Sequence, residues 1–503
     1  MKKAPKTGLT RTLALILLLL LVCASCLTAI GCNVKEPETK PGNNTTAAQG
    51  QTTSGEPEVE YPQYDKDFRI MHRSDRPYEF KVKDTSTADP VNDAVYSRNQ
   101  LIEKRYNVTI QNLMYDGSWE NRDADGAFKK TLSVWMEAQQ DAVDLIAGYH
   151  RVMLPTVANG WYVDWLTVPN IDLRADEWQN GINDVLTINN KNYSITGDIT
   201  LTFWKAMSAM VFNDAMLPDY LDNGVDIYEV VSSGKWDLDY MMRIAQKVSS
   251  TGEGTNRIYG FASNNSIALD AFASGFGMQT VTKDENGNFR FALETDRNTM
   301  LLDKLVKLYQ AEYTYREQYN QELDHANDPS HALFPTGHVL FNAMQFEMIE
   351  RSNIRGMNDK YGVLPYPKFD SNQENYHTLV ADGVSLMFVP NTKTEKDLEM
   401  VGTVTAGLAE ASRELVNPKY IEIVLQGTVS RDEQSAEMID LIRNNVFVDP
   451  GYILNGTAGL ALRNLTINNA FNFDGPKTLK VYWEKYGAGA QKNLNDLLDF
   501  YNK

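Results

Sequence analysis

Short apolar runs alternate with amphipathic stretches between residues 68 and 147, and this alternation limits the fold more than any other feature. The apolar runs are typical of strands and cover residues 68–71, 108–110 and 142–147. Residues 89–106 place apolar side chains on one helical face, and residues 128–139 predict a second helix. The order strand, helix, strand, helix, strand predicts an α/β fold, with a parallel sheet and helices on both of its faces.

The residues directly after the first and third of these strands are candidates for a binding site. Parallel sheets bind ligands at the carboxyl ends of their strands. Arg73 and Asp75 follow the first strand, and Tyr149, His150 and Arg151 follow the third. The alternative for both segments is a solvated loop. We expect these side chains to line a ligand cleft.

The N-terminus has the pattern of an export signal. Four basic residues precede an apolar stretch, residues 13–22, which is shorter than the roughly 20 residues that a membrane-spanning helix needs. Small residues then precede Cys32, an arrangement that resembles the bacterial lipobox, and Cys26 is the rival site. We expect residues 1–31 to be a lipoprotein signal peptide. A lipid on Cys32 would then hold the chain at the outer face of a cell membrane.

A polar linker separates this signal from the rest of the chain. Residues 32–63 begin with the predicted lipidated cysteine and are rich in Pro, Glu, Thr, Gly, Asn and Gln, with almost no large apolar side chains. Such a segment cannot bury enough apolar surface to fold, so we expect a disordered tether. Roughly 440 residues follow, which is enough for two or more lobes.

The charge of the chain excludes some classes of partner. There are 66 acidic and 48 basic residues, a formal net charge of −18. The signal segment contains four of the basic residues and no acidic ones, so the remainder is more acidic still. An acidic surface argues against binding to nucleic acid and against flat binding to anionic lipid.

No catalytic or metal-binding motif is present. The six histidines form no His-Glu-x-x-His pair, and all three cysteines lie within the first 32 residues. There is no Gly-x-Ser-x-Gly elbow and no phosphate-binding loop. Residues 121–126 look like the first half of a calcium loop, but Leu132 stands where that loop has Glu. We expect no metal, no cofactor and no enzyme activity, with a glycoside hydrolase carboxylate pair as the alternative.

Three further segments have local predictions. Residues 431–442 and 494–501 are amphipathic and predict helices that pack on the core. Residues 284–288 have the composition of a hairpin turn.

Five segments resemble one family, in that family's order. They are Asp144-Leu145-Ile146 with Asn159-Gly160-Trp161-Tyr162-Val163-Asp164, then residues 209–217, Gly234-Lys235-Trp236-Asp237, Tyr361-Gly362-Val363-Leu364-Pro365-Tyr366-Pro367, and residues 383–390. Together they resemble the extracellular solute-binding lipoproteins of bacterial ABC importers. The resemblance is to family 1, the group of the maltose- and oligosaccharide-binding proteins.

The resemblance implies a two-lobed periplasmic-binding-protein-like fold of class II. Parallel-rich sheets flanked by helices would form the lobes, with the ligand cleft at the hinge. Residues 64–207 and 385–445 would form lobe 1, and residues 208–384 and 446–503 would form lobe 2. Closure around a solute would be a hinge motion.

The resemblance also implies the function and the partners. The chain would act as a monomer that captures a small solute, most plausibly a carbohydrate, and delivers it to permease subunits served by a separate ATPase. The host would be a Gram-positive bacterium. Two alternatives stay open: a surface-anchored glycoside hydrolase, and a lipoprotein that senses a ligand for a partner other than a transporter.

Five more residues are candidate ligand contacts. Asp198 and Thr200 precede the first crossover between the lobes, where a turn with a helix cap is the equal alternative. Gln345 and Phe346 lie where the resembled family often has a stacking aromatic, although core packing is as good an explanation for Phe346. Asp382 lies at the second crossover, where its carboxylate would face the hinge.

Overall fold

A computed structural model describes most of the chain beyond the predicted tether. The described residues are 60–81, 89–123, 125–248, 257–264, 266–285, 289–315, 329–425, 433–455 and 458–502. The predicted signal peptide, Cys32 and nearly all of the tether lie outside these residues. Residues 61–503 form one compact unit, and two sheets organise it.

The first part of the chain builds most of the first sheet. Its elements are β1 (Lys66–Arg73), η1 (Pro77–Glu79), α2 (Pro90–Tyr106), β2 (Val108–Tyr115), α3 (Ala127–Glu137), β3 (Leu145–Tyr149), α4 (His150–Met153), η2 (Leu154–Asn159), η3 (Trp165–Thr167), α5 (Asn180–Leu186) and α6 (Leu201–Lys205).

The middle of the chain builds the second sheet. Its elements are β4 (Ser208–Asn213), η4 (Leu217–Asp219), α7 (Ile227–Ser232), α8 (Leu238–Lys247), β5 (Tyr259–Ser263), α9 (Ile267–Gly275), β6 (Val281–Lys283), β7 (Phe289–Phe291), α10 (Asp296–Gln310), α11 (Pro329–Leu333), η7 (Phe334–Thr336), β8 (Val339–Gln345), α12 (Phe346–Ile349), α13 (Ser352–Arg355) and β9 (Tyr361–Leu364).

The last part returns to the first sheet and then runs through helices. Its elements are β10 (Ser385–Phe388), α14 (Glu395–Ala411), a short π-helical segment η8 (Ser412–Val416), α15 (Asn417–Val424), α16 (Glu433–Asn444), α17 (Pro450–Asn455), α18 (Ala461–Ala470) and α19 (Leu479–Tyr501).

The first sheet has the strand order β10-β3-β1-β2. β1 pairs in parallel with β2 and with β3, and Ile70 lies opposite Leu145. β10 pairs antiparallel with β3. Successive residues of a strand point to opposite faces. Ile70 therefore packs in the core beneath α2 and α14, while Met71 packs in the core that includes α3.

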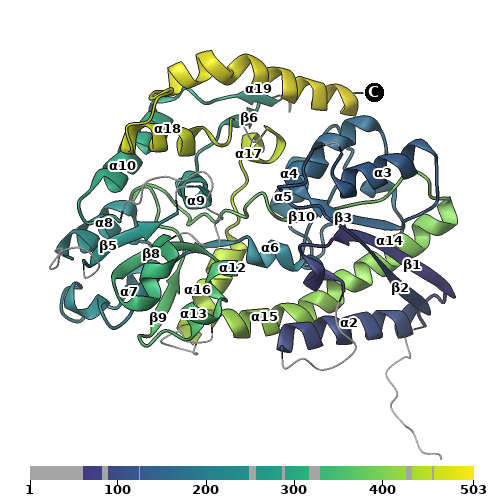
Figure 1. Cartoon of the computed structure of the whole chain (residues 1–503), viewed down its shortest axis with the longest axis horizontal. Helices are drawn as coiled ribbons and strands as arrows, with labels where there is room; N and C mark the ends of the chain where they lie inside the picture. The colour runs from purple at the N-terminus through teal and green to yellow at the C-terminus, as the bar shows by residue number, and fades with distance from the viewer. Residues whose placement is uncertain are drawn as a thin grey trace, which may run out of the picture. The chain divides into compact units, whose positions relative to one another are not determined.

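The second sheet has the order β5-β8-β4-β9. β5 and β8 are parallel, whereas β4 is antiparallel to both of its neighbours. Both β4 and β10 directly follow a segment that arrives from the other sheet. β10 is an edge strand and is antiparallel to its single neighbour, β3. In Figure 1 the first sheet lies to the right and the second to the left, with α6 between them. The predicted two-lobed α/β architecture is confirmed.

A buried carboxylate ties the two crossover segments together. Glu79 is 1% exposed and accepts hydrogen bonds from Thr202, through its N–H (3.1 Å) and its hydroxyl (2.6 Å), and from the Ser385 hydroxyl (2.8 Å). Thr202 lies in α6, on the first crossover, and Ser385 begins β10, after the second. The guanidinium of Arg98 is also buried and donates to the backbone carbonyl of Glu79 (2.8 Å). Glu79, Thr202 and Ser385 are called the hinge knot below.

One large core runs through both lobes. It joins residues beneath α3 of the first lobe, such as Phe128, to the sheet of the second lobe, such as Phe341. A separate core, around Phe68 and Trp165, fills the other face of the first sheet. The lobes are therefore not independent globules.

The C-terminal helices pack on both lobes. The sequence groups residues up to 445 with lobe 1, whereas α16 packs against β9 of the second sheet. α18 packs against α9 and α10, and α19 continues from it to contact η2 of the first lobe. The predicted hairpin is formed by β6 and β7, which pair antiparallel, although residues 286–288 of its turn lie outside the described residues.

Within the part of the chain that the structure describes, none of the helices combines the length and the apolarity needed to cross a membrane.

Candidate functional site

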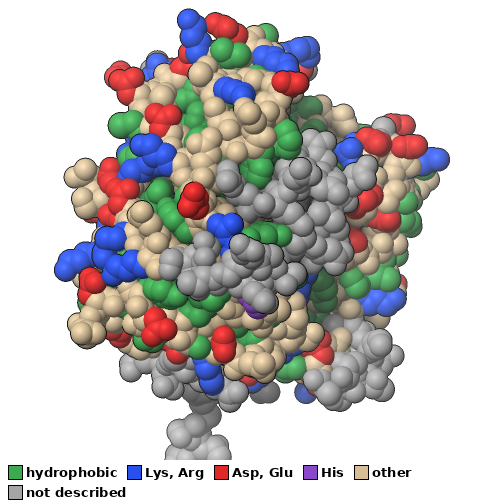
Figure 2. Space-filling model, turned by 60° about the vertical axis from the view of Figure 1, so that its left-hand side comes forward, with side chains coloured by type: hydrophobic (Ala, Val, Ile, Leu, Met, Phe, Trp, Pro, Cys, Tyr) green, Lys and Arg blue, Asp and Glu red, His purple; other side chains and the backbone are tan. Residues whose placement is uncertain are grey.

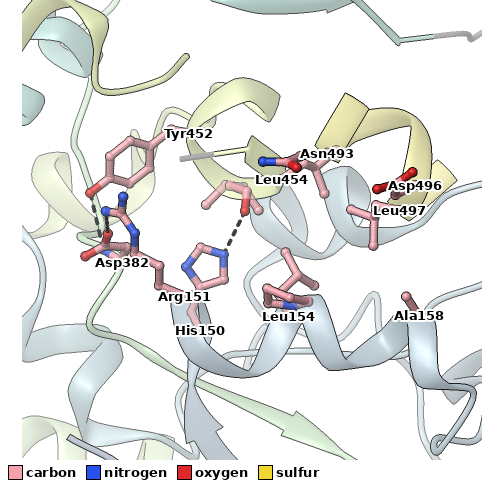
Figure 3. Close-up of a pocket in the computed structure, with 12 residues that line it drawn as sticks. His150, Arg151, Leu154, Ala158, Asp382, Tyr452, Leu454, Asn493, Asp496 and Leu497 are labelled. Atoms are coloured by element: carbon pink, nitrogen blue, oxygen red, sulfur yellow. Dashed lines mark hydrogen bonds and ion pairs between the residues drawn. The ribbon is translucent and has the colours of Figure 1, made fainter. Parts of the chain in front are cut away.

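A cavity of about 400 Å³ opens where the carboxyl end of β3 meets the C-terminal helices (Figure 3). This volume falls within the roughly 300–1,000 Å³ that small-molecule sites usually have. The lining comes from α4, η2, the second crossover, α17 and α19: His150, Arg151, Leu154, Pro155, Ala158, Asp382, Tyr452, Ile453, Leu454, Asn493, Asp496 and Leu497. The cavity is thus built by segments that are far apart in the sequence.

A charged pair lies at one end of the cavity. Arg151 Nη1 is 2.6 Å from Asp382 Oδ2, and the two side chains are 28% and 14% exposed. The backbone N–H of Asp382 donates to the hydroxyl of Tyr452, which lies on α17 (3.3 Å). The lining therefore presents a planar cation, a carboxylate and a phenol at fixed positions (Figure 3). Such groups can exchange hydrogen bonds with hydroxyls.

A second arginine, Arg73, lies next to the charged pair, but neither it nor the predicted residues Asp75 and Tyr149 are among those that line the cavity. Arg73 is 3% exposed and forms a two-point contact with Asp75, at 2.6 and 3.2 Å. Its other nitrogen, Nη1, donates to the carbonyl of Gly383 (2.8 Å), beside Asp382. The Arg73 guanidinium also lies 4.7 Å from the centre of the Tyr149 ring. The predicted residues Arg73, Asp75 and Tyr149 therefore meet at the second crossover.

Beside the cavity, though not among the residues that line it, lies the exposed aromatic side chain of Trp119, which the sequence analysis missed. Trp119 follows β2 and is 42% exposed. Its ring lies 6.1 Å from that of Tyr149, centre to centre, and 5.4 Å from the guanidinium of Arg151. The guanidinium of Arg122 lies 4.3 Å from the same ring. An exposed ring beside a charged pair is what a sugar ring requires, since its C–H face stacks and its hydroxyls hydrogen bond.

The predicted residue His150, at the start of α4, lines the cavity but is almost fully buried and holds the surrounding segments together. The side chain is 2% exposed, and its Nε2–H donates to the carbonyl of Ile453 on α17 (2.9 Å). Burial lowers the pKa of the imidazole, so it is neutral at pH 7. His150 thus connects α4 of the first lobe to α17.

Asp198 and Thr200 are both buried and lie among other partners. Asp198 accepts from the indole N–H of Trp204 (3.2 Å) and pairs with Arg443 of α16 (2.9 Å). Burial raises the pKa of Asp198. Thr200 precedes α6, and its hydroxyl donates to the carbonyl of Gly197 (3.2 Å) without capping the helix. Neither residue is among those that line the cavity.

Gln345 and Phe346 join β8 to α12 in the second lobe. Gln345 is 8% exposed and reaches the carbonyl of Ala206 (3.5 Å). Phe346 is fully buried in the large core, which agrees with the alternative of core packing given for it above. Neither residue lines the cavity. A ligand role for these residues stays a prediction.

A buried acid lies behind the charged pair. Asp270, on α9, is 2% exposed, and its Oδ1 is 3.3 Å from Nε of Arg463 on α18. Burial raises the pKa of Asp270 to about 7, an increase that Asp382 reinforces and that Arg463 and Arg151 oppose. The side chains of Tyr452, Tyr366 and Tyr482 are close enough to interact with it electrostatically.

The residues in and beside the cavity that the sequence analysis missed have two kinds of origin. Trp119 follows the carboxyl end of β2, but the strand was predicted to end at residue 110 and extends to Tyr115, so the rule applied to the other two strands did not reach it. Tyr452, Asn493 and Asp496 come from α17 and α19, and no local pattern indicates that these helices reach β3. Among the described residues, no group of three or more His, Cys, Asp or Glu is placed to hold a metal ion.

Comparison with known proteins shows the fold of the chain. No protein-family model matches it, and no curated protein matches it in sequence. Its structure is similar to an ABC substrate-binding protein from Listeria monocytogenes, solved in complex with cycloalternan. The TM-score is 0.52 at 10% sequence identity, and the match covers 86% of this chain and 99% of that one. At this identity the likeness establishes a substrate-binding-protein fold.

Proposed function

We propose that this chain captures a carbohydrate in the cavity beside β3 and delivers it to an ABC importer, without chemical conversion. The observation that carries the proposal is the wall at the carboxyl ends of β1, β2 and β3, where exposed Trp119 lies beside the Arg151–Asp382 pair. The likeness to a substrate-binding protein solved with a cyclic oligosaccharide supports it. Closure of the two lobes would bring residues from opposite sides of the cavity into contact with the solute.

The balance of charge around the cavity suits a neutral solute. Arg151 is paired with Asp382, and Arg73 is paired with Asp75. Asp496 on α19 is paired with Lys492 (2.5 Å). On the face seen in Figure 2, acidic and basic side chains are interspersed over the described surface. A neutral polyol would therefore meet hydrogen-bonding groups whose charges are already compensated.

Thermal unfolding of the purified chain tests this function. A sugar that binds the folded state alone stabilises it by about 2.7 kcal/mol at a concentration of 100 Kd. We expect a saturable rise in melting temperature with a neutral oligosaccharide and none with peptides. Release of reducing sugar during the assay would identify a hydrolase instead, and no shift with any saccharide would refute carbohydrate capture.

Removal of the exposed Trp119 ring tests where the sugar binds. Trp119→Ala should weaken sugar binding about fivefold or more, because loss of a stacking aromatic removes about 1–3 kcal/mol. Its melting temperature without sugar should change little, since the ring is 42% exposed. Tyr96→Ala is the control, because Tyr96 is a 36% exposed aromatic on α2. Equal affinities for wild type and Trp119→Ala, measured by calorimetry, would place the sugar elsewhere.

The proposal extends to the predicted anchor. A lipid on Cys32 and the tether of residues 32–63 would keep the capture domain at the outer face of the membrane, beside its permease. Mass spectrometry of the membrane fraction should find an acylated N-terminal cysteine that Cys32→Ala removes and Cys26→Ala retains. Loss of the acyl chain in Cys26→Ala alone would move the anchor to Cys26.

A further inference from the structure

The final helix, α19, is attached to both lobes. Its first turns pack in the second lobe, where the hydroxyl of Tyr482 accepts from Asn464 of α18 (3.1 Å). The ring of Trp483 lies 4.7 Å from that of Phe291 on β7. Figure 1 shows the helix running from α18 toward α4 and α5, with the C-terminus at its far end.

The last turn of α19 packs on the first lobe. Phe500 and Tyr501 each place a ring 5.2 Å from that of Tyr193. The ammonium of Lys191 reaches the carbonyl of Tyr501 (3.5 Å), and the side chains of Asn189 and Asn502 hydrogen bond. Any change in the angle between the lobes must therefore bend α19 or detach one of its ends.

The stretch between these two attachments faces the cavity. Asn493, Asp496 and Leu497 lie across it from Leu154 and Ala158 (Figure 3). Asn493 and Asp496 bring an amide and a carboxylate to a side of the cavity that is otherwise largely apolar. They are the groups of α19 that can hydrogen bond a solute held there.

Two glycines interrupt α19 between its attachment to the second lobe and its cavity-facing part. Gly487 has a packing reason, because a Cβ there would lie 2.6 Å from the Trp483 ring. Gly489 has none, because a Cβ there would meet nothing within 4 Å. Glycine in a helix interior is less favourable than alanine by a factor of about five. Gly489 therefore weakens the helix at a place where alanine would fit.

We propose that residues 490–501 of α19 form a movable roof over the cavity, which pivots at Gly487–Gly489 as the lobes open and close. Asn493 and Asp496 are the solute-binding residues that the roof carries. The pivot follows from the attachments of α19 alone, whereas the role of Asn493 and Asp496 rests on the proposed function.

Hydrogen exchange of the full chain without any sugar tests the pivot. The amides of residues 490–493 donate across the glycine pair, so bending there exposes them. Gly489→Ala should slow their exchange about fivefold, the ratio of the two helix propensities. The control is Asn495→Ala, which also raises helix propensity but lies beyond the pivot, and it should leave these amides unchanged. Equal slowing by both variants would mean fraying of the helix end and would overturn the pivot.

A second variant releases the roof at its far attachment. Phe500→Ala removes one of the two ring contacts to Tyr193 and should speed exchange across residues 490–501. Tyr486→Ala is the control, since Tyr486 is a 37% exposed aromatic that contacts Tyr482 on the same helix. Unchanged exchange in Phe500→Ala would overturn the idea that this contact holds the roof.

The rates of sugar association and dissociation then distinguish a failure of the roof proposal from a failure of the proposed function. With cycloalternan as the probe, Gly489→Ala should slow association and dissociation together, and Asn493→Ala should speed dissociation. Exchange effects as expected but no binding of cycloalternan or of any other saccharide would refute the carbohydrate function and leave the pivot standing. Binding with kinetics unchanged in every variant would refute the roof and leave the function standing.

Discussion

Replacing Glu79 by alanine should lower the free energy of unfolding by about 4 kcal/mol, because the change leaves the buried donors of the hinge knot without their acceptor and removes the negative charge near the buried cation Arg98. The N–H and hydroxyl of Thr202 and the hydroxyl of Ser385 all donate to this carboxylate. Arg98 is fully buried, and the charge of Glu79 is what offsets the effect of burial on its pKa. Chemical denaturation at neutral pH measures the loss.

Two variants show which part of this loss comes from the charge. Glu79→Gln keeps the shape and one acceptor oxygen, so it should destabilise by less than alanine does. Ser385→Ala removes a single hydrogen bond and should lower the free energy of unfolding by about 1 kcal/mol. A smaller loss in the free energy of unfolding for Glu79→Ala than for Ser385→Ala would contradict a stabilising role of the Glu79 carboxylate in the hinge knot.

The pH dependence of stability should change when Asp270 is replaced by asparagine. The pKa of Asp270 is raised to about 7 in the fold, against about 3.9 in an unfolded chain. Between these values the folded state holds a proton that the unfolded state has lost, so the carboxyl contributes stability at low pH that is lost as the pH rises toward 7. Relative to Asp270→Asn, the wild-type free energy of unfolding should therefore fall by about 1 kcal/mol per pH unit from pH 4 to 7.

Denaturation of both proteins at a series of pH values measures this difference directly. The effects of the other titrating groups on stability are the same in both proteins and cancel in the comparison. These groups include the buried His72 and the half-buried His377, whose pKa values burial lowers to about 4. A difference that stays constant from pH 4 to 7 would mean that Arg463 keeps the carboxylate ionised at every pH in that range. In that case the ion pair, at 3.3 Å, outweighs burial.

The sequence was sufficient to predict elements whose signals are local. The first helix begins where expected, because Asp89 accepts from the N–H groups of Val91 and Asn92 and Pro90 suits the first turn. It ends at Asn107, which adopts the left-handed conformation at φ 51°. The three parallel strands also form at the apolar runs, with β1 and β2 longer than predicted and β3 running from Leu145 to Tyr149 instead of from residue 142 to 147. Patterns of this kind depend only on neighbours along the chain.

Other features depend on contacts that no local pattern reveals. The antiparallel pairing of β10 with β3 follows from the direction in which the crossover arrives. The final helix was predicted over residues 494–501, yet α19 begins at Leu479, because Thr478 caps it and its first turns pack on α18. Gly487 and Gly489 break the helical pattern in the sequence without ending the helix.

The candidate site shows the same division. Arg73, Asp75, Tyr149 and Arg151 follow strands of a parallel sheet, so a general rule about sheets brings them together. Asp382 joins them because the second crossover returns beside β3. The opposite side of the cavity belongs to helices that begin some 300 residues later in the chain, and their position is a product of tertiary packing.

The discontinuous first sheet has a consequence for the order in which the chain can fold during synthesis. All four strands of the second sheet lie between residues 208 and 364, whereas the first sheet lacks β10 until residue 388 has been made. The half that is synthesised first is therefore the half whose sheet is completed last. Until β10 is made, the open edge of β3 exposes unpaired backbone groups, which is the kind of surface that chaperones protect.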